Sequence, residues 1–190
     1  MQLKEIIKNA GLMLGKSDVV NYVDGSYDVG SDTYDTVNLM VNLSNLVINE
    51  LACTYLPLVA EEEISFSYGK AFYKNFNKKA VKIIGVYTIT GQVLDFIDKT
   101  EYVFVPTKSN VMENLVVEYQ YSPTNYALED EIGYTEKDIS SRVIAYGVAS
   151  EVCIIEGEFE QAVMHHKRYV DEIALLTMPK NAMIKQRSWK

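Results

Sequence analysis

The sequence predicts an α+β fold in which a helical bundle carries an inserted small antiparallel β-sheet or sandwich and ends in an extended C-terminal tail. Apolar residues recur every three or four positions near both ends of the chain, which is typical of amphipathic helices. Between them lies a block rich in β-branched and aromatic residues. We therefore expect residues 1–62 and 127–178 to form the bundle, residues 63–126 the β insert and residues 179–190 the tail.

The N-terminal region predicts one short helix and one loop. Leu3, Ile6, Ile7 and Ala10 have helical spacing, so a helix is expected over residues 2–14. Residues 15–32 are rich in Asp, Gly and Ser, which predicts a loop or an extended arm whose role the sequence leaves open.

A long helix is predicted next, beginning near residues 31–33 with Ser, Asp or Thr as its cap. Its apolar positions cover more than one face, which indicates packing against several neighbours. They are Val37, Met40, Val41, Leu43, Ser44, Leu46, Val47, Ile48, Leu51 and Tyr55. Pro57 is expected to kink or end this helix.

The β insert is predicted to contain about five strands from Ile64 onward. The segments "VKIIGVYTIT" and "VLDFI" predict a hairpin with a two-residue turn at Gly91 and Gln92. The clearest strand is "NLVVEYQYSP" at residues 114–123. Its alternation places one set of side chains on a common face: Leu115, Val117, Tyr119 and Tyr121.

A helical pattern of more than 30 residues precedes the tail. Its stripe, expected to face the core, consists of Ile144, Val148, Val152, Ile155, Phe159, Ala162, His166, Tyr169, Ile173 and Leu176. A straight helix of that length would span roughly 50 Å. The pattern therefore indicates a kink or two helices, with Gly147 and Gly157 as candidate breaks. Upstream, Thr135 and Asp138 resemble a capping box.

Composition and motifs exclude several classes of function. The chain has 190 residues and a net charge of −8, which disfavours nucleic acid as a general partner. No apolar run is long enough to span a membrane, and the N-terminus lacks a signal-peptide pattern, so we expect a protein made in the cytoplasm. Motifs for nucleotide binding or hydrolysis are absent, and we assign no catalytic residue, cofactor or metal ligand.

Cysteine, histidine and acidic residues often form catalytic or metal sites in proteins, but the sequence gives no such pattern for them in this chain. Cys53 and Cys153 are predicted to be small buried residues, with a disulfide left open. Of the two histidines, His166 is expected to pack and His165 to lie at the surface. Acidic runs at residues 61–63 and 129–131 either bind a cation together or form solvated surface.

The tail and the tyrosines are the candidate partner-binding residues. The tail is basic and contains the single tryptophan, and a large aromatic residue next to a chain end indicates docking. Its expected binding residues are Met183, Ile184, Lys185, Arg187, Trp189 and Lys190. Small and aromatic residues elsewhere are candidates for contacts between subunits: Gly147, Ser150, Tyr119 and Tyr121.

The order of these elements resembles the head-to-tail adaptor (connector) proteins of tailed bacteriophages. The resemblance is carried by "NELACTYLPLVAEEEI", "VYTITGQVLDF", "NLVVEYQYSP" and "ISSRVIAYGVASEVCIIEGEFEQAVMHHKRYVDEIALL", followed by a basic aromatic end. It spans most of the chain and is one of layout, without a diagnostic motif. Tail tubular protein A and the ring proteins below the portal of crAss-like phages are similar in this respect.

The resemblance implies a non-enzymatic virion protein that forms a ring, usually of twelve copies, between the portal and the tail. It implies that the tail of the chain binds the portal or a neighbouring copy. The insert would face outward or contact other tail proteins, and genome DNA would pass through the channel without specific binding. Two other functions stay open from the residues themselves. One is a cellular binding module that uses the tyrosine-rich insert, and the other is a metal-dependent hydrolase that uses the acidic junctions.

Overall fold

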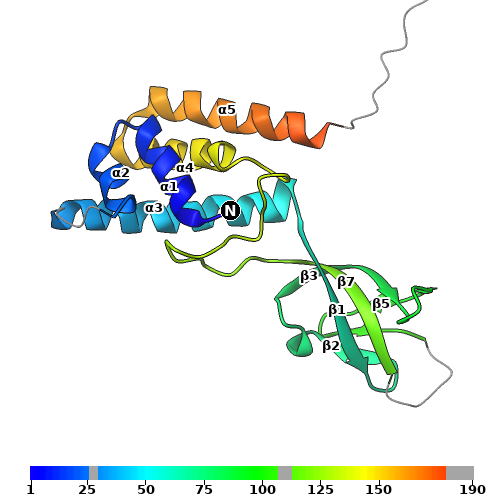
Figure 1. The fold of residues 1–190 in the computed structure, drawn as a ribbon. Coiled ribbons are helices and arrows are strands. Elements are labelled where there is room, and N and C mark those ends of the chain that lie inside the picture. The colour runs from blue at the N-terminus through cyan, green and yellow to red at the C-terminus, as the bar shows by residue number, and fades with distance from the viewer. Residues whose placement is uncertain (26–29, 107–112, 179–190) are drawn as a thin grey trace, which may run out of the picture.

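The computed structural model describes residues 1–25, 30–106 and 113–178, and these form a mixed α+β structure (Figure 1). The helices in these ranges are α1 (Leu3–Met13), α2 (Ser17–Val23), α3 (Ser31–Glu50), α4 (Ser141–Glu156) and α5 (Phe159–Thr177). The strands are β1 (Leu58–Phe66), β2 (Lys70–Phe72), β3 (Ala80–Tyr87), β4 (Val93–Leu94), β5 (Ile97–Asp98), β6 (Tyr102–Phe104) and β7 (Glu113–Tyr121).

Figure 1 shows the helices grouped in one part of the molecule and the strands in another. We call these the helical part and the β part. In the helical part, α4 packs against α1, α3 and α5, so it is the central helix. Its residues 143–150 are all buried, because neighbours cover every side of this stretch. Leu3, Ile6, Ile7 and Ala10 of α1 are buried as the helical spacing predicts.

The loop predicted over residues 15–32 is wrong for residues 17–23, which form α2. Gly15 adopts a left-handed backbone conformation with φ of 67° and reverses the chain after α1. Val19 is then buried against Gly11, where an added Cβ would lie 3.3 Å from the Val19 side chain. A single buried valine among Asp and Ser residues is a weak periodic signal, which explains the error.

A π-helical turn at Leu51–Tyr55 follows α3, and Pro57 lies in the extended chain after it. The helix therefore ends before the proline, as expected. Strand β1 begins at Leu58, so residues 58–62 belong to the sheet and not to the helical part as predicted. The acidic run at residues 61–63 lies within this strand and does not mark a junction.

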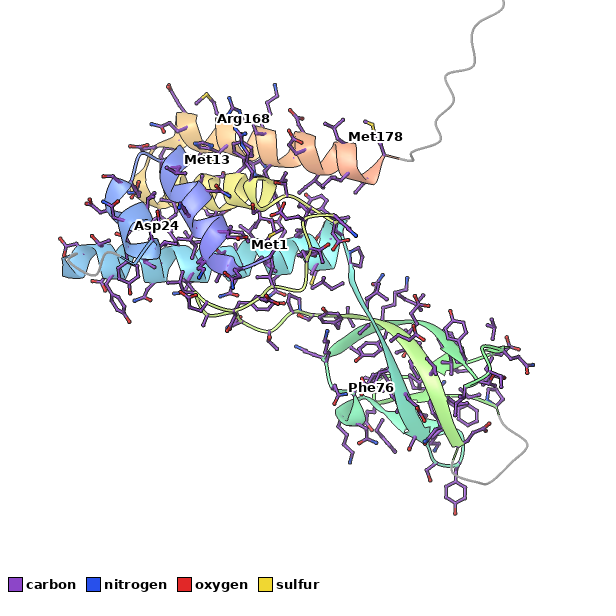
Figure 2. All side chains as sticks on the ribbon, in the orientation of Figure 1. Met1, Met13, Asp24, Phe76, Arg168 and Met178 are labelled. Carbon is purple, nitrogen blue, oxygen red and sulfur yellow. The ribbon has the colours of Figure 1, made fainter. Side chains whose placement is uncertain are left out.

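The β part contains two antiparallel sheets, with strand orders β1-β7-β3-β4 and β2-β6-β5. The predicted strand at residues 114–123 is β7, which pairs with β1 and β3 on its two edges. Its predicted inward face is confirmed, because four alternating side chains are buried: Leu115, Val117, Tyr119 and Tyr121. Figure 2 shows Phe76 among the strands, and its ring contacts that of Tyr119 at a centroid distance of 4.9 Å.

The hairpin between β3 and β4 forms, but its predicted two-residue turn is wrong. The last pair before the turn is Tyr87 and Val93, so five residues connect the strands. The Gly91 N–H donates to the Thr88 carbonyl and the Thr88 N–H donates to the Gln92 carbonyl. Thr88 and Gln92 therefore continue the pairing and leave residues 89–91 as a three-residue loop. Gly91 has φ of 85°, the left-handed residue with which such a loop usually ends.

The return from β7 to α4 carries the predicted capping box, but no helix begins there. Thr135 donates its backbone N–H and its hydroxyl to the Asp138 carboxylate, and the chain makes a single turn. These hydrogen bonds hold the pKa of Asp138 below its usual range. Helix α4 starts later, where Ser140 accepts a hydrogen bond from the Arg142 N–H as its N-cap.

The long C-terminal pattern is two helices, and the break is at Gly157. This residue has φ of 80° and follows α4 as a left-handed cap. Gly147, the other candidate break, lies inside α4 and is buried without interrupting it. No helix in the described part of the chain combines the length and the apolar character that a bilayer crossing requires.

Candidate assembly surface

An apolar hollow lies beside the connection between α4 and α5. Only Gly157 and Glu158 separate the helices, and the Glu158 N–H donates to the Cys153 carbonyl at 2.8 Å. The helices then run side by side. Ser150 donates its hydroxyl to the Ala162 carbonyl of α5 at 3.0 Å, which fixes the two helices at this level.

A groove of about 370 Å³ lies between these helices near their connection. Its lining is mostly apolar, and Glu151 and His166 also contribute to it. Three large apolar residues of this lining are far more exposed than core residues: Ile154 is 46% exposed, Phe159 66% and Val163 68%. Contiguous exposed apolar surface of this kind marks a contact with another molecule.

A second set of exposed apolar residues belongs to the β part. Ile89 in the turn after β3 is 69% exposed, and Val93 on β4 is 71% exposed. Ile97 on β5 is also exposed. Figure 1 shows β5 far from the connection between α4 and α5, so the two apolar surfaces are separate.

Two arginines, one from α4 and one from α5, lie close to the ring of Tyr146 on α4. The guanidinium carbons of Arg142 and Arg168 lie 5.7 and 5.6 Å from the Tyr146 ring centroid, and His165 stacks on the same ring. Neither arginine forms an ion pair with a carboxylate in the described part of the chain. Burial, with the charge of Arg168, lowers the pKa of His165, which favours the neutral imidazole.

The acidic residues of the sheet take part in local hydrogen bonds with tyrosines. Tyr119 donates its hydroxyl to Glu62 at 2.7 Å, and Tyr87 donates to Glu118 at 2.9 Å. Burial and the Glu62 carboxylate raise the pKa of Tyr119 to about 12. The hydrogen bond to Glu118 likewise raises the pKa of Tyr87. These carboxylates therefore support the sheet.

Of the two alternatives for the acidic runs, a shared cation site has no support among the described residues. The run at residues 61–63 lies in β1, whereas Glu129 forms an ion pair with Lys4 at 2.8 Å and Asp130 accepts a hydrogen bond from the Ala127 N–H. Across residues 1–25, 30–106 and 113–178, no three His, Cys, Asp or Glu side chains are grouped as a metal site requires. The acidic junctions proposed for a hydrolase therefore do not form one site.

The four predicted subunit-contact residues are buried inside their own chain, which corrects that prediction. Gly147 packs against Tyr169 of α5, and Ser150 donates to α5. Tyr119 and Tyr121 face the interior of the β part. The small residues Gly147 and Ser150 do allow close packing of helices, but the packed helices belong to the same chain. The predicted docking residues lie outside the described residues: Met183, Ile184, Lys185, Arg187, Trp189 and Lys190.

The predictions for cysteines and histidines are partly wrong. Cys153 is buried as expected, but Cys53 is exposed in the π-helical turn, and both thiols are free. His165 is the half-buried histidine and His166 the exposed one, which is the reverse of the prediction. The histidines were assigned from a single apolar stripe that continues past Gly157, whereas the break there separates the faces of α4 and α5.

The groove itself was missed from the sequence because Phe159 falls on the predicted core stripe. A signal was present beside it. Val163 and Met164 are apolar but lie off the stripe, so α5 is apolar on a second side. Both are exposed in the structure. No model of a known protein family matches this chain, and a search of curated proteins finds no match either.

Proposed function

We propose that this protein is a structural subunit of a tailed-bacteriophage virion, located at the head–tail junction and made in the host cytoplasm. Copies of it form a ring beneath the portal that connects the head to the tail. The observation that supports this function best is the exposure of large apolar residues on two separate surfaces, around Phe159 and around Val93. A ring subunit uses a different surface for each of its two neighbours. The ring closes when the rotations between successive copies add up to one full turn.

The layout of the chain fits this role. On this proposal α1 to α5 act as one bundle that builds the ring, and the β part is an insert that contacts the next tail proteins. The acidic composition of the protein, with 26 acidic against 18 basic residues, allows DNA to pass through a channel without adhering. The ring would have twelve copies if it follows the adaptor proteins that the chain resembles.

A binding module based on the tyrosine-rich insert has less support. Tyr119 and Tyr121 are buried, and Tyr134 is also buried, with its hydroxyl donated to the Leu56 carbonyl. These side chains hold the β part and its connection together. They do not form the exposed aromatic face that such a module requires.

The test is the molar mass in solution, measured by light scattering for the protein alone and mixed with the portal protein of the same virus. We expect a discrete multiple of the chain mass, at the latest in the mixed sample. Val93→Glu should weaken this assembly, because a charge on the exposed surface of β4 opposes burial in a contact. Thr90→Glu, in the exposed turn nearby, is the matched control. A monomer under all conditions, with the portal present, contradicts the proposal.

A further inference from the structure

We infer that the groove between α4 and α5 of one copy binds the C-terminal residues 183–190 of a second copy. The inference rests on the proposed function, because that function supplies the neighbouring copy. It adds the identity of the segment that fills the groove, and three properties of the groove and the tail support it: shape, charge and position.

The groove has the size and lining for one large aromatic side chain. Its volume is about 370 Å³, and Ile154, Phe159 and Val163 give it apolar walls. A buried tryptophan removes about 150–250 Å² of surface from water and is the residue type most enriched at binding hot spots. The chain has a single tryptophan, Trp189, in the tail.

The charges of the two segments are opposite. Glu151 lines the groove, and Glu158 and Glu160 flank Phe159 in the sequence with exposed side chains. Residues 180–190 contain four basic residues, among them Lys185 and Arg187, and no acidic residue. Attraction between these segments favours encounter and fixes the orientation of the bound tail.

The positions of the groove and the tail favour a contact between copies. Phe159 is the first residue of α5 and Thr177 the last, and the 18 steps between them span about 27 Å. Figure 2 shows Met178 at the far end of α5 from the connection to α4. A donor at one end of a helix and an acceptor at the other form a head-to-tail contact that repeats around a ring. Binding within one chain would instead need the tail to turn back along the full length of α5.

Two full-length variants test the inference directly. Val163→Glu places a charge in the groove and leaves the tail intact, whereas Trp189→Ala leaves the groove intact and disables the tail. Trp189 is the only tryptophan, so all tryptophan emission from a mixture comes from the Val163→Glu chain. We expect its emission to shift to the blue on titration with the Trp189→Ala chain, and light scattering to show a one-to-one complex. Neither variant alone should show either change.

The groove is identified by a matched pair of acceptors in the Trp189→Ala background. One acceptor also carries Val163→Glu, and the other carries Leu175→Glu, an equally exposed position on α5 that does not line the groove. The Val163→Glu acceptor should bind at least about tenfold more weakly, which corresponds to losing the burial of one apolar side chain. The Leu175→Glu acceptor should bind as the parent does. Circular dichroism of all variants checks that the fold is intact.

The possible outcomes separate this inference from the proposed function. Absence of a blue shift at every ratio overturns the inference, as does equal binding by the two acceptors. A blue-shifted emission in the isolated Val163→Glu chain that does not depend on concentration also overturns it, because the tail would then dock on its own chain. Rings that persist in both single variants overturn the inference but leave the proposed function standing. If the two variants form a one-to-one complex but the natural chain forms no ring, even with the portal protein, the inference stands and the proposed function is overturned.

Discussion

Two buried tyrosines should respond in opposite directions to the loss of their hydroxyl groups. Tyr134 and Tyr169 are both almost fully buried, and burial raises the pKa of each phenol well above its usual range. The Tyr134 hydroxyl donates to the Leu56 carbonyl at 2.6 Å. The Tyr169 hydroxyl has no hydrogen-bond partner among the described residues. We therefore expect Tyr134→Phe to destabilise the protein and Tyr169→Phe to stabilise it.

The expected magnitudes follow from the energetics of buried polar groups. A typical hydrogen bond contributes about 0.5–1.5 kcal/mol net, so Tyr134→Phe should lower the free energy of unfolding by about 1 kcal/mol. A buried hydroxyl without a partner costs about 1–3 kcal/mol, so its removal from Tyr169 should raise that free energy by about 1 kcal/mol or more. The two changes delete the same atom, so the side-chain volume lost is equal.

Urea unfolding followed by circular dichroism measures both effects. The midpoint concentration should rise for Tyr169→Phe and fall for Tyr134→Phe, with an unchanged denaturant slope showing that only the stability of the native state has altered. Two midpoints that move in the same direction would refute the reasoning. So would a loss of stability in Tyr169→Phe, because it would mean that the hydroxyl has a hydrogen-bond partner that contributes to stability.

Three further changes test the packing and the sheet. Gly147→Ala should destabilise the protein by about 1 kcal/mol, because the new Cβ would lie 2.8 Å from the Val47 side chain and overpacking of 1–3 kcal/mol outweighs the gain in helix propensity. In a double-mutant cycle, Val47→Ala should relieve at least about 0.5 kcal/mol of this cost, and additive effects would contradict the contact. Ser150→Ala should lower the free energy of unfolding by about 1 kcal/mol through loss of its hydrogen bond to α5, and an unchanged thermal midpoint would argue against that bond. The pKa of Tyr119 is raised from 10.0 to about 12, so its contribution to stability is complete below pH 10 and is lost as the pH rises to about 12. Glu62→Gln removes one cause of that rise, so stability measured across this pH range should fall less steeply, and identical slopes would show that the carboxylate has no influence.

The sequence predicted the strongly periodic elements and failed where the signal was local or depended on partners. Strand β7 and helix α1 were predicted well, because each has one buried face with a clear period. Helix α2 was missed because only Val19 is buried in it. The start of β1 was predicted too late. Three consecutive acidic residues, 61–63, interrupt the alternation of apolar and polar residues that marks a strand with one buried face.

The candidate site depended on the angle between two helices, which periodicity does not encode. The apolar stripe correctly placed Ala162 and Tyr169 in the core. It also placed Phe159 there, although the turn at Gly157 leaves this residue exposed. Small residues in α4 indicated close helix approach, but spacing alone does not distinguish a helix of the same chain from a helix of a neighbour. The structure shows that the partners are α3 and α5 of the same chain.

The chain crosses twice between the helical part and the β part, and both crossings are hydrogen-bonded to helices or to each other. The Asn45 amide of α3 pairs with both backbone groups of Tyr126, at 2.7 and 2.9 Å, and Ser122 donates to Asn49 at 3.2 Å. Tyr134 joins the second crossing to the first at Leu56. A force applied to the sheets is therefore shared among these hydrogen bonds, which oppose a change in the angle between the β part and the helical part.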